Sequence, residues 1–326
     1  MRRSLQATNI LGSSAGGGAP DIIARMHAEK IYSMSPKQSL GGTFTLRGTS
    51  TTINRLGYGA MQLTGPMVWG EPKDRDTAVA VVREAIALGV NHIDTSDYYG
   101  PHVANQIIRE AIHPYHKDLI IVTKVGAKRG PDKSWPKALS PAELTSAIHD
   151  NLRNLGLEAL DIVNLRVGEA HGANEASIAG PLETLASLKK QGLIRHIGLS
   201  NVSRRQYLES QPITDIVCVQ NHYNLAHRHD DAFVDELAGK GIAYVPFFPL
   251  GGFKPLQSAT LAKVAASLKT TPMQLALAWL LHRSPNILLI PGTSSLAHLR
   301  ENIAAAALTL PPGAIGELDK ISREKA

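Results

Sequence analysis

Residues 119–166 contain a strand, a helix and a second strand in succession. The first strand is the apolar run Leu119-Ile-Ile-Val-Thr-Lys124, the helix is predicted at about Pro141–Leu155, and the second strand is Leu160-Asp-Ile-Val-Asn-Leu-Arg166. Short apolar runs that alternate with amphipathic helices are typical of parallel strands covered by helices on one or both faces. The stretch therefore predicts a βαβ unit in a parallel α/β sheet.

The same alternation extends in both directions along the chain. Further strands are predicted at Ile53–Met61, Val90–Asp94, Ile194–Ser200, Ile216–Gln220, Ile242–Phe248 and Ile287–Pro291. Further helices are predicted at about Asp74–Leu88, His102–Ile112, Ile178–Gln191, Ser203–Ser210, Asp231–Lys240, Ala259–Leu268, Pro272–His282 and Ser295–Ala306. Eight strands, each followed by helix, predict a (β/α)8 TIM barrel, a fold of about 250 residues that carries its chemistry at the C-terminal ends of the strands. A short N-terminal β-hairpin is expected in front of it.

Residues 1–40 differ from the rest of the chain in composition and in hydrophobic periodicity. They are rich in small residues and show only one helix-like segment, at about Asp21–Tyr32. We interpret them as a poorly ordered extension in front of one barrel domain at 41–326. Two arginines followed by an acid-free stretch would fit an organelle transit peptide. The favoured alternative is a start codon placed too early, with Met26 or Met34 as the start of the compact protein.

Composition narrows the possible partners. The chain has 326 residues, of which 43% are hydrophobic and 19% charged, and 34 basic against 28 acidic residues give a net charge of +6. Residues 1–40 hold five basic and two acidic residues, so three of the six excess charges lie there. The rest are spread without an arginine-rich stripe, which favours a small anionic ligand over nucleic acid. No stretch is long and apolar enough to span a membrane.

Cysteine and histidine usage excludes two kinds of site. Cys218 is the single cysteine, so neither an internal disulfide nor a multi-cysteine metal site is possible, and a cytoplasmic location is expected. It lies inside the apolar run Ile216–Gln220, which predicts a core residue rather than a nucleophile. The histidines do not show ligand spacing, and no metal is expected.

Three ionisable side chains follow two successive strands. Asp94 ends one strand, Tyr99 lies in the loop Asp94-Thr-Ser-Asp-Tyr-Tyr99-Gly100, and Lys124 ends the next strand. A free tyrosine has a pKa of about 10, so it becomes a useful acid only when neighbours perturb it. A lysine held against the phenol oxygen and oriented by Asp94 would do so. The grouping predicts a site that protonates a carbonyl, although singly Asp94 would serve as a helix cap and Lys124 as a solvated residue.

From about Thr43 to Ile321 the chain resembles the aldo-keto reductases. The spacing of Asp94, Tyr99 and Lys124 matches the catalytic pattern of that family at the second and third strands. Cofactor motifs of the family are matched by Gly198-Leu-Ser-Asn201, by Val219-Gln-Asn-His-Tyr-Asn224 and by Arg300-Glu-Asn302. The resemblance implies an aldehyde reductase that uses NADP(H), with Tyr99 as the proton donor.

The resemblance also assigns residues to the cofactor. The expected carboxamide contacts are Ser200, Asn201 and Gln220, the residue that stacks on the nicotinamide is Phe247, the pyrophosphate neighbours are Pro249, Leu250 and Gly251, and the contacts to the adenosine end are Gly292, Ser294, His298, Glu301 and Asn302. The alternatives are helix caps for Ser200 and Asn201, a strand-end polar group for Gln220 and a core aromatic for Phe247. Some members have lysine in place of Gly292 and arginine in place of His298, so NADH remains an alternative to NADPH.

Arg166 departs from the family pattern, because most members carry a catalytic histidine at the end of the fourth strand. Arginine is always charged and offers a planar fork of donors that could bind an anionic oxygen beside the reacting carbonyl. The segments Leu56–Gln62 and Tyr244–Gly252 are similar to the bacterial branch of the family that reduces pyridoxal, whose 3-hydroxyl is such an oxygen. Pyridoxal is the expected substrate. The alternative for Arg166 is an ion pair with Glu169 or Asp94.

Other functions stay open. They are a general carbonyl reductase, a redox-sensing nicotinamide-binding subunit, and a Schiff-base aldolase that uses Lys124. Trp69 and Trp135 lie in the loops after the first and third strands, where they would form aromatic walls for a flat substrate or anchor the loops. A small aldehyde is the only partner that the sequence predicts, and either a monomer or a homodimer fits.

Overall fold

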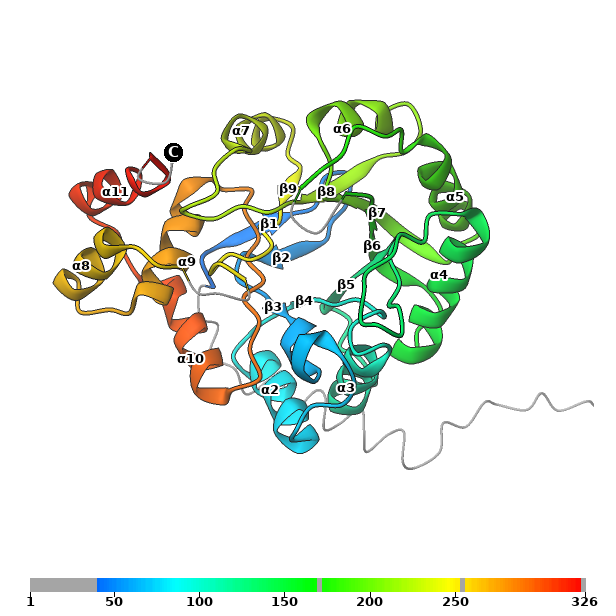
Figure 1. Cartoon of the computed structure of the whole chain (residues 1–326), viewed down its shortest axis with the longest axis horizontal. Coiled ribbons are helices and arrows are strands. Elements are labelled where there is room, and N and C mark those ends of the chain that lie inside the picture. The colour runs from blue at the N-terminus through cyan, green and yellow to red at the C-terminus, as the bar shows by residue number, and fades with distance from the viewer. Residues whose placement is uncertain (1–39, 169–171, 253–255, 324–326) are drawn as a thin grey trace, which may run out of the picture.

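The computed structural model describes residues 40–168, 172–252 and 256–323. The predicted N-terminal extension, with its helix-like segment Asp21–Tyr32, lies outside these residues. Seven parallel strands form one curled sheet in chain order, with helices around its outside (Figure 1). The strands are β3 (Tyr58–Gly59), β4 (His92–Asp94), β5 (Ile120–Val125), β6 (Leu160–Arg166), β7 (Ile194–Ser200), β8 (Ile216–Gln220) and β9 (Ala243–Tyr244).

The predicted eighth strand closes the barrel without being a regular strand. Gly59 pairs in parallel with Gly292 on one side of this segment, and Tyr244 pairs with Ile287 on the other. The approach to β3 is close, because a Cβ atom on Gly59 would lie 2.5 Å from a backbone carbonyl oxygen of the segment. Glycine is therefore required at Gly59. The pairing expected for Ile287–Pro291 is confirmed, and with it the (β/α)8 barrel.

The first predicted strand is wrong in its bounds. Within Ile53–Met61, only Tyr58–Gly59 belongs to the barrel sheet, and a 3-10 turn follows at Ala60–Leu63. Ile53 lies instead in β2 (Thr52–Asn54), which pairs antiparallel with β1 (Thr43–Thr45) to form the expected hairpin. One apolar run thus serves two elements, because the chain leaves the hairpin and enters the barrel within a few residues.

Helices cover the outside of the barrel (Figure 1). They are α2 (Arg75–Ala87), α3 (Val103–Ile112), α4 (Pro141–Leu155), α5 (Ala179–Lys190), α6 (Arg204–Ser210), α7 (Asp231–Gly239), α8 (Ala259–Ser267), α9 (Pro272–Arg283), α10 (Leu296–Ala304) and α11 (Pro312–Leu318). Further 3-10 turns are Pro66–Val68, Ala305–Ala307 and Ile321–Arg323. Capping boxes, in which the cap side chain and a residue three positions later bond each other's backbone amides, begin α4 at Ser140, α6 at Ser203 and α9 at Thr271.

The core has two layers. The larger one fills the space between the strands and the helices. The smaller one lies inside the barrel, where Val122, Ile162 and Leu288 pack against Leu46 and Ile53 of the hairpin. The hairpin lies across the centre of the barrel in Figure 1. Asn91, just before β4, donates to the Thr52 carbonyl and accepts from the Asn54 amide, so the hairpin closes the end at which the strands begin. Chemistry is therefore confined to the other end.

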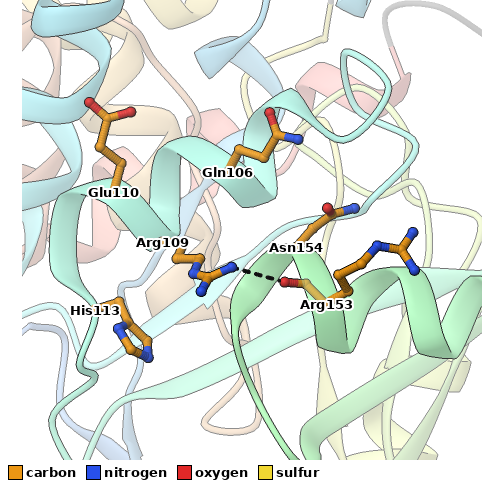
Figure 2. Close-up of a pocket in the computed structure, with 6 residues that line it drawn as sticks. All are labelled: Gln106, Arg109, Glu110, His113, Arg153 and Asn154. Carbon is orange, nitrogen blue, oxygen red and sulfur yellow. Dashed lines mark hydrogen bonds between the residues drawn. The ribbon is translucent and has the colours of Figure 1, made fainter.

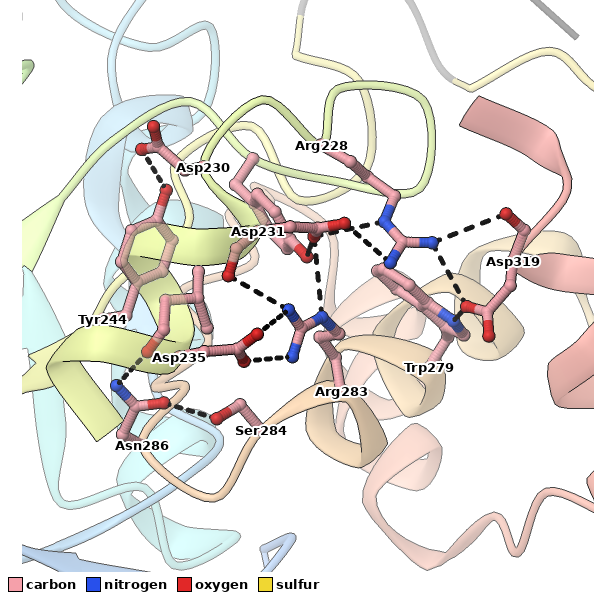
Figure 3. Close-up of polar contacts among 12 residues, drawn as sticks. Arg228, Asp230, Asp231, Asp235, Tyr244, Trp279, Arg283, Ser284, Asn286 and Asp319 are labelled. Carbon is pink, nitrogen blue, oxygen red and sulfur yellow. Dashed lines mark hydrogen bonds and ion pairs between the residues drawn. The ribbon is translucent and has the colours of Figure 1, made fainter. Parts of the chain in front are cut away.

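Helix α11 had no counterpart among the predicted elements, and a polar cluster attaches it to the barrel (Figure 3). Asp319, just after α11, accepts hydrogen bonds from the Arg228 guanidinium at 3.2 Å and from Trp279 Nε1 at 3.0 Å. Arg283 in turn donates to Asp235 at 2.7 Å. These charged partners come from helices α7 and α9 and the loops beside them, so the docking of α11 depends on contacts that are distant in sequence.

His92 lies inside the barrel on β4, two residues before Asp94. Its side chain occupies the space left by the missing Cβ of Gly57 and is 2% exposed. Burial lowers the pKa of His92 from 6.5 to about 4. The imidazole is therefore neutral in the folded protein near neutral pH.

This burial predicts an acid-sensitive fold. Between pH 6.5 and about 4 the unfolded chain holds a proton on His92 that the folded chain does not. Stability from this group is thus present above pH 6.5 and is lost as the pH falls through that window, by up to about 3 kcal/mol. Urea unfolding at several pH values measures it. His92→Leu should flatten this part of the profile, whereas His149→Gln, which changes an exposed histidine, should not; an unchanged slope in His92→Leu contradicts the prediction.

Candidate active site

Asp94 and Lys124 form a buried ion pair at the C-terminal ends of β4 and β5. Lys124 Nζ donates to Asp94 Oδ1 at 2.5 Å and to the Thr95 carbonyl at 2.9 Å. The second carboxylate oxygen, Asp94 Oδ2, accepts a hydrogen bond from Gln220 Nε2 at 2.8 Å. Only 5% and 4% of the two charged side chains are exposed. The barrel therefore brings three predicted site residues from three strands into one contact.

Tyr99 lies beside this pair, with 8% of its surface exposed. Lys124 Nζ is 5.2 Å from the centroid of the Tyr99 ring. Burial raises the pKa of Tyr99 far above its ordinary value, the negative charge of Asp94 raises it further, and the positive charge of Arg166 acts in the opposite direction. The expectation that neighbours bring this pKa down is not met in this structure. The phenol stays protonated near neutral pH, and as a weak acid it gives up that proton only to an oxygen that gains negative charge in the reaction.

A buried hydrogen-bond network supports the loop that carries Tyr99. Asn105 of α3 accepts from Thr95 Oγ1 at 2.9 Å and donates to Asp97 at 3.0 Å. It also donates at 3.0 Å to Asn151 of α4. Both asparagine side chains are fully buried. Neither asparagine could be predicted from the sequence, since an isolated asparagine within a helical pattern carries no signal of its own.

Arg166 is half-buried at the end of β6. Its guanidinium carbon lies 5.7 Å from the centroid of the Phe247 ring. The same ring also contacts His222, which stacks nearly parallel to it at 5.5 Å, and Phe248, which meets it edge to face at 5.3 Å. Of the two ion-pair partners considered for Arg166, Glu169 lies outside the described residues, and both carboxylate oxygens of Asp94 accept the bonds given above. Arg166 thus faces the same end of the barrel as Tyr99.

Two buried oxygens at the strand ends have no partner within the described residues. They are Ser200 Oγ, at the end of β7, and Gln220 Oε1, at the end of β8. Between them, Asn201 adopts a left-handed conformation with φ of 61° and donates its backbone N–H to the Gln220 carbonyl at 2.9 Å. Buried polar atoms without partners indicate a missing ligand or water. A primary carboxamide, which offers N–H donors, fits these two acceptors.

The loop after β9 holds the residues expected near a pyrophosphate. Pro249 is buried, and Leu250 and Gly251 are half-buried. Phe248 has a φ of 53°, which is unusual for a non-glycine residue. Its carbonyl oxygen accepts from Asn224 Nδ2 at 2.9 Å and from the Gly251 amide at 3.0 Å. These bonds fix the path of the loop.

The residues expected at the adenosine end lie on α10 and just before it. Gly292 packs against Gly59, Ser294 and His298 are exposed, and Asn302 is buried. Glu301 accepts a hydrogen bond at 2.6 Å from Thr271, the cap of α9. The exposed Ser294 and His298 could therefore contact a charged ligand, whereas Glu301 is already bonded to a neighbouring helix.

The hollows at the described surface include two of similar volume. One, of about 450 Å³, opens at the C-terminal ends of β7 and β8 and is lined in part by Asn201 and His222. The other, of about 410 Å³, lies between α3 and α4 (Figure 2). It is lined by Gln106, Arg109, Glu110, His113, Arg153 and Asn154. None of these six residues was predicted for the active site, and Arg109 donates to the Arg153 carbonyl at 3.1 Å.

Three other features of the described residues are the single cysteine, the grouping of possible metal ligands and the length of the helices. Cys218 is buried, and burial raises its pKa to about 12, which confirms a core residue. Across residues 40–168, 172–252 and 256–323, no three His, Cys, Asp or Glu side chains are grouped so that they could hold a metal ion. Over the same residues, every helix is too short or too polar to cross a bilayer.

Comparisons with known proteins agree with this geometry. A model of the aldo/keto reductase family matches residues 55–323. Pyridoxine 4-dehydrogenase of Escherichia coli strain K12 is 67% identical over 284 residues, which cover 86% of this chain and 99% of that protein. An uncharacterized oxidoreductase of Schizosaccharomyces pombe is 36% identical, over 85% of this chain and 89% of that protein.

Solved structures lead to the same assignment. A thermostable aldo-keto reductase in complex with the inhibitor epalrestat is 30% identical, with a TM-score of 0.73 over 86% of this chain and 99% of that one. The family model matches most of the chain, and the Escherichia coli protein is 67% identical over 99% of its own length. The chain belongs to the aldo/keto reductase family.

Proposed function

We propose that this protein is an NADPH-dependent aldehyde reductase that reduces pyridoxal to pyridoxine. The observation that carries the proposal is the meeting of Tyr99, Lys124 and Asp94 beside the two unpartnered acceptors Ser200 Oγ and Gln220 Oε1. The choice of substrate is supported by the 67% identity to the pyridoxine 4-dehydrogenase of Escherichia coli. We further infer a cytoplasmic enzyme, monomeric or homodimeric, with no macromolecular partner.

The described residues fit a nicotinamide cofactor. Ser200 and Gln220 would hold the carboxamide, with Asn201 between them, and this fixes which face of the ring points toward Tyr99. When bound, NADPH supplies the hydride that the aldehyde carbon accepts. The loop 249–251 would follow the pyrophosphate, and the exposed His298 would meet the adenosine phosphate. Because Gly292 has no side chain there, NADH remains the alternative donor.

The protein's own part in the chemistry is the proton. Tyr99 donates its phenolic proton to the carbonyl oxygen as that oxygen gains negative charge, so the aldehyde becomes an alcohol. Because its pKa is raised, Tyr99 carries its proton when the substrate binds. Two positive charges stabilise the phenolate that remains. Arg166 acts to lower the pKa of Tyr99, and Lys124 Nζ lies 5.2 Å from the centroid of the ring.

Arg166 supports pyridoxal as the substrate. Its guanidinium lies over Phe247 and acts electrostatically on Tyr99, so a planar aldehyde between them would present its ring hydroxyl to a fixed positive charge. Pyridoxal carries such a hydroxyl directly beside its aldehyde. A charge-assisted hydrogen bond there would orient the aldehyde toward Tyr99.

The test compares pyridoxal with benzaldehyde, which lacks the hydroxyl. Wild-type protein should oxidise NADPH with pyridoxal at a far higher kcat/KM than with benzaldehyde. Arg166→His should lower kcat/KM for pyridoxal by about tenfold to a hundredfold, since a charged hydrogen bond is lost, and should spare benzaldehyde. Arg195→His is the control, because Arg195 is exposed on the same sheet at the start of β7.

Three results would argue against the proposal. If Arg166→His lowers kcat/KM equally for pyridoxal and benzaldehyde, Arg166 does not orient the substrate. Comparable activity of the wild type on both aldehydes would make the protein a general carbonyl reductase. Tight NADPH binding without turnover of any aldehyde would favour a redox-sensing subunit.

A further inference from the structure

Two loops meet beside Tyr99 at the mouth of the barrel. The loop after β5 folds back on itself, with Ala127 paired antiparallel to Lys137, and it carries Trp135. The loop after β3 contains Trp69, which pairs with Gly100 directly after Tyr99. The two loops come from separate strands, so something must hold them together if they are to present one surface to a substrate.

Arg129 joins the two loops. Its guanidinium carbon lies 3.8 Å from the Trp135 ring centroid and 5.2 Å from that of Trp69, so it contacts an aromatic ring of each loop. Its described hydrogen bonds all go to backbone carbonyls. The acceptors are Val68 at 2.6 Å, Met67 at 3.2 Å and Lys133 at 3.0 Å. One side chain therefore holds both loops by stacking and by hydrogen bonds, which is the geometry for which arginine is better suited than lysine.

The backbone that Arg129 holds is strained. Met67 and Val68 have φ values of 63° and 58°, in the left-handed region that non-glycine residues, and β-branched ones above all, rarely adopt. Such a conformation persists only where the surroundings impose it. The carbonyls of both residues accept from Arg129, and the Val68 carbonyl also accepts from the Gly100 amide at 3.2 Å. The strained turn is thus fixed to the residue after Tyr99.

Trp135 completes the surface beside the catalytic tyrosine. Its ring meets Tyr98 edge to face at 5.6 Å and Tyr99 at 6.5 Å. Trp135 is 41% exposed and Met67 68% exposed, so this rim keeps apolar surface in water. Exposed aromatic surface at the edge of an active site is typical of a place where a flat ring binds.

We propose that Arg129 is a specificity-determining positioning residue, which holds Trp69 and Trp135 as a wall that selects flat aromatic aldehydes over small aliphatic ones. The inference rests on the proposed aldehyde reductase function, but it concerns the shape of the site rather than the identity of pyridoxal. A purely structural Arg129 would instead affect folding and every substrate alike.

The experiment separates binding of a flat ring from chemistry. The dead-end ligand 4-pyridinemethanol is titrated into the protein with NADPH, and its Kd is measured by tryptophan fluorescence, which needs no turnover. Arg129→Gln and Arg129→Lys should raise this Kd about tenfold, since stacking and the planar fork of donors are lost. The KM for isonicotinaldehyde should rise in parallel while its kcat, the kcat/KM for propanal and the Kd for NADPH stay unchanged. Arg153→Gln, an exposed arginine on α4, is the control.

A second variant tests whether Arg129 acts through Trp135. Trp135→Leu should raise the same Kd, and the double variant Arg129→Gln/Trp135→Leu should raise it no further, because both changes remove one wall. The proposal is overturned if the double variant multiplies the two increases in Kd, or if kcat/KM falls equally for isonicotinaldehyde and propanal. It is also overturned if the wild-type protein does not bind 4-pyridinemethanol. Wild-type activity on isonicotinaldehyde without activity on pyridoxal would overturn the proposed substrate and leave the role of Arg129 supported.

Discussion

Tyr99→Phe is expected to lower kcat for aldehyde reduction by at least about a hundredfold, the scale of a lost general acid. The change removes one oxygen from a side chain that is buried beside Lys124 and Asp94. The ring remains, so its contacts with Tyr98 and Trp135 are kept. The affinity for NADPH should therefore change little, which a fluorescence titration measures beside the steady-state rates.

Tyr98→Phe provides the matched control. Tyr98 is equally buried, it lies next to Tyr99 in sequence, and burial raises its pKa to about 12. It also lies within the influence of the same positive charges, those of Arg166 and Lys124. If phenol chemistry in general supported turnover, both variants would lose activity. We expect only Tyr99→Phe to lose activity. Substantial turnover by Tyr99→Phe would mean that another group donates the proton.

The pH dependence of the reaction follows from the same environment. Burial and Asp94 raise the pKa of Tyr99, so the phenol stays protonated near and above neutral pH. From the sequence, Lys124 beside the phenol predicts a shift in the opposite direction, because the sequence does not show how deeply Tyr99 is buried. Lys124 is hydrogen-bonded to Asp94 and Thr95, and the negative charge of Asp94 raises the pKa of Tyr99. The sign of a pKa shift depends on packing that only the folded chain defines.

The site residues at the C-terminal ends of strands were the ones that could be predicted best from the sequence. Asp94, Lys124 and Gln220 could be placed together, since parallel strands end at one edge of the barrel and each residue closes an apolar run. Arg129 and Asn105 could not be predicted. Arg129 lies in a polar loop that reads as solvated, and its role comes from stacking between Trp69 and Trp135, which are distant in the chain. Long-range pairing of single polar residues leaves no local pattern.

The same contrast applies to the elements. The strand patterns near 160–166 and 194–200 were long and gave correct bounds. The run 53–61 failed because period and composition do not show where a hairpin ends and a barrel strand begins. Helix α11 was missed because it is short and held by Asp319, whose partners Arg228 and Trp279 lie on other elements.

Lys124→Met should destabilise the protein by about 3–5 kcal/mol, the scale for breaking a buried ion pair. The methionine fills much of the space, but Asp94 would keep a charge inside the barrel with Gln220 as its remaining described partner. Lys128→Met is the control in the same part of the chain. Lys128 pairs with Glu143 at 2.7 Å, but its side chain is 58% exposed, so its loss should cost less than about 1 kcal/mol.

The double variant Asp94→Asn/Lys124→Met separates stability from catalysis. With both charges removed, no uncompensated charge stays buried, and urea unfolding should show most of the lost stability restored. Turnover should not return, because the positive charge that stabilises the Tyr99 phenolate is still missing. If the double variant is instead as unstable as the sum of the single changes, the pair stabilises the barrel by its own attraction. If it regains turnover, Lys124 holds the fold and takes no part in the proton transfer from Tyr99.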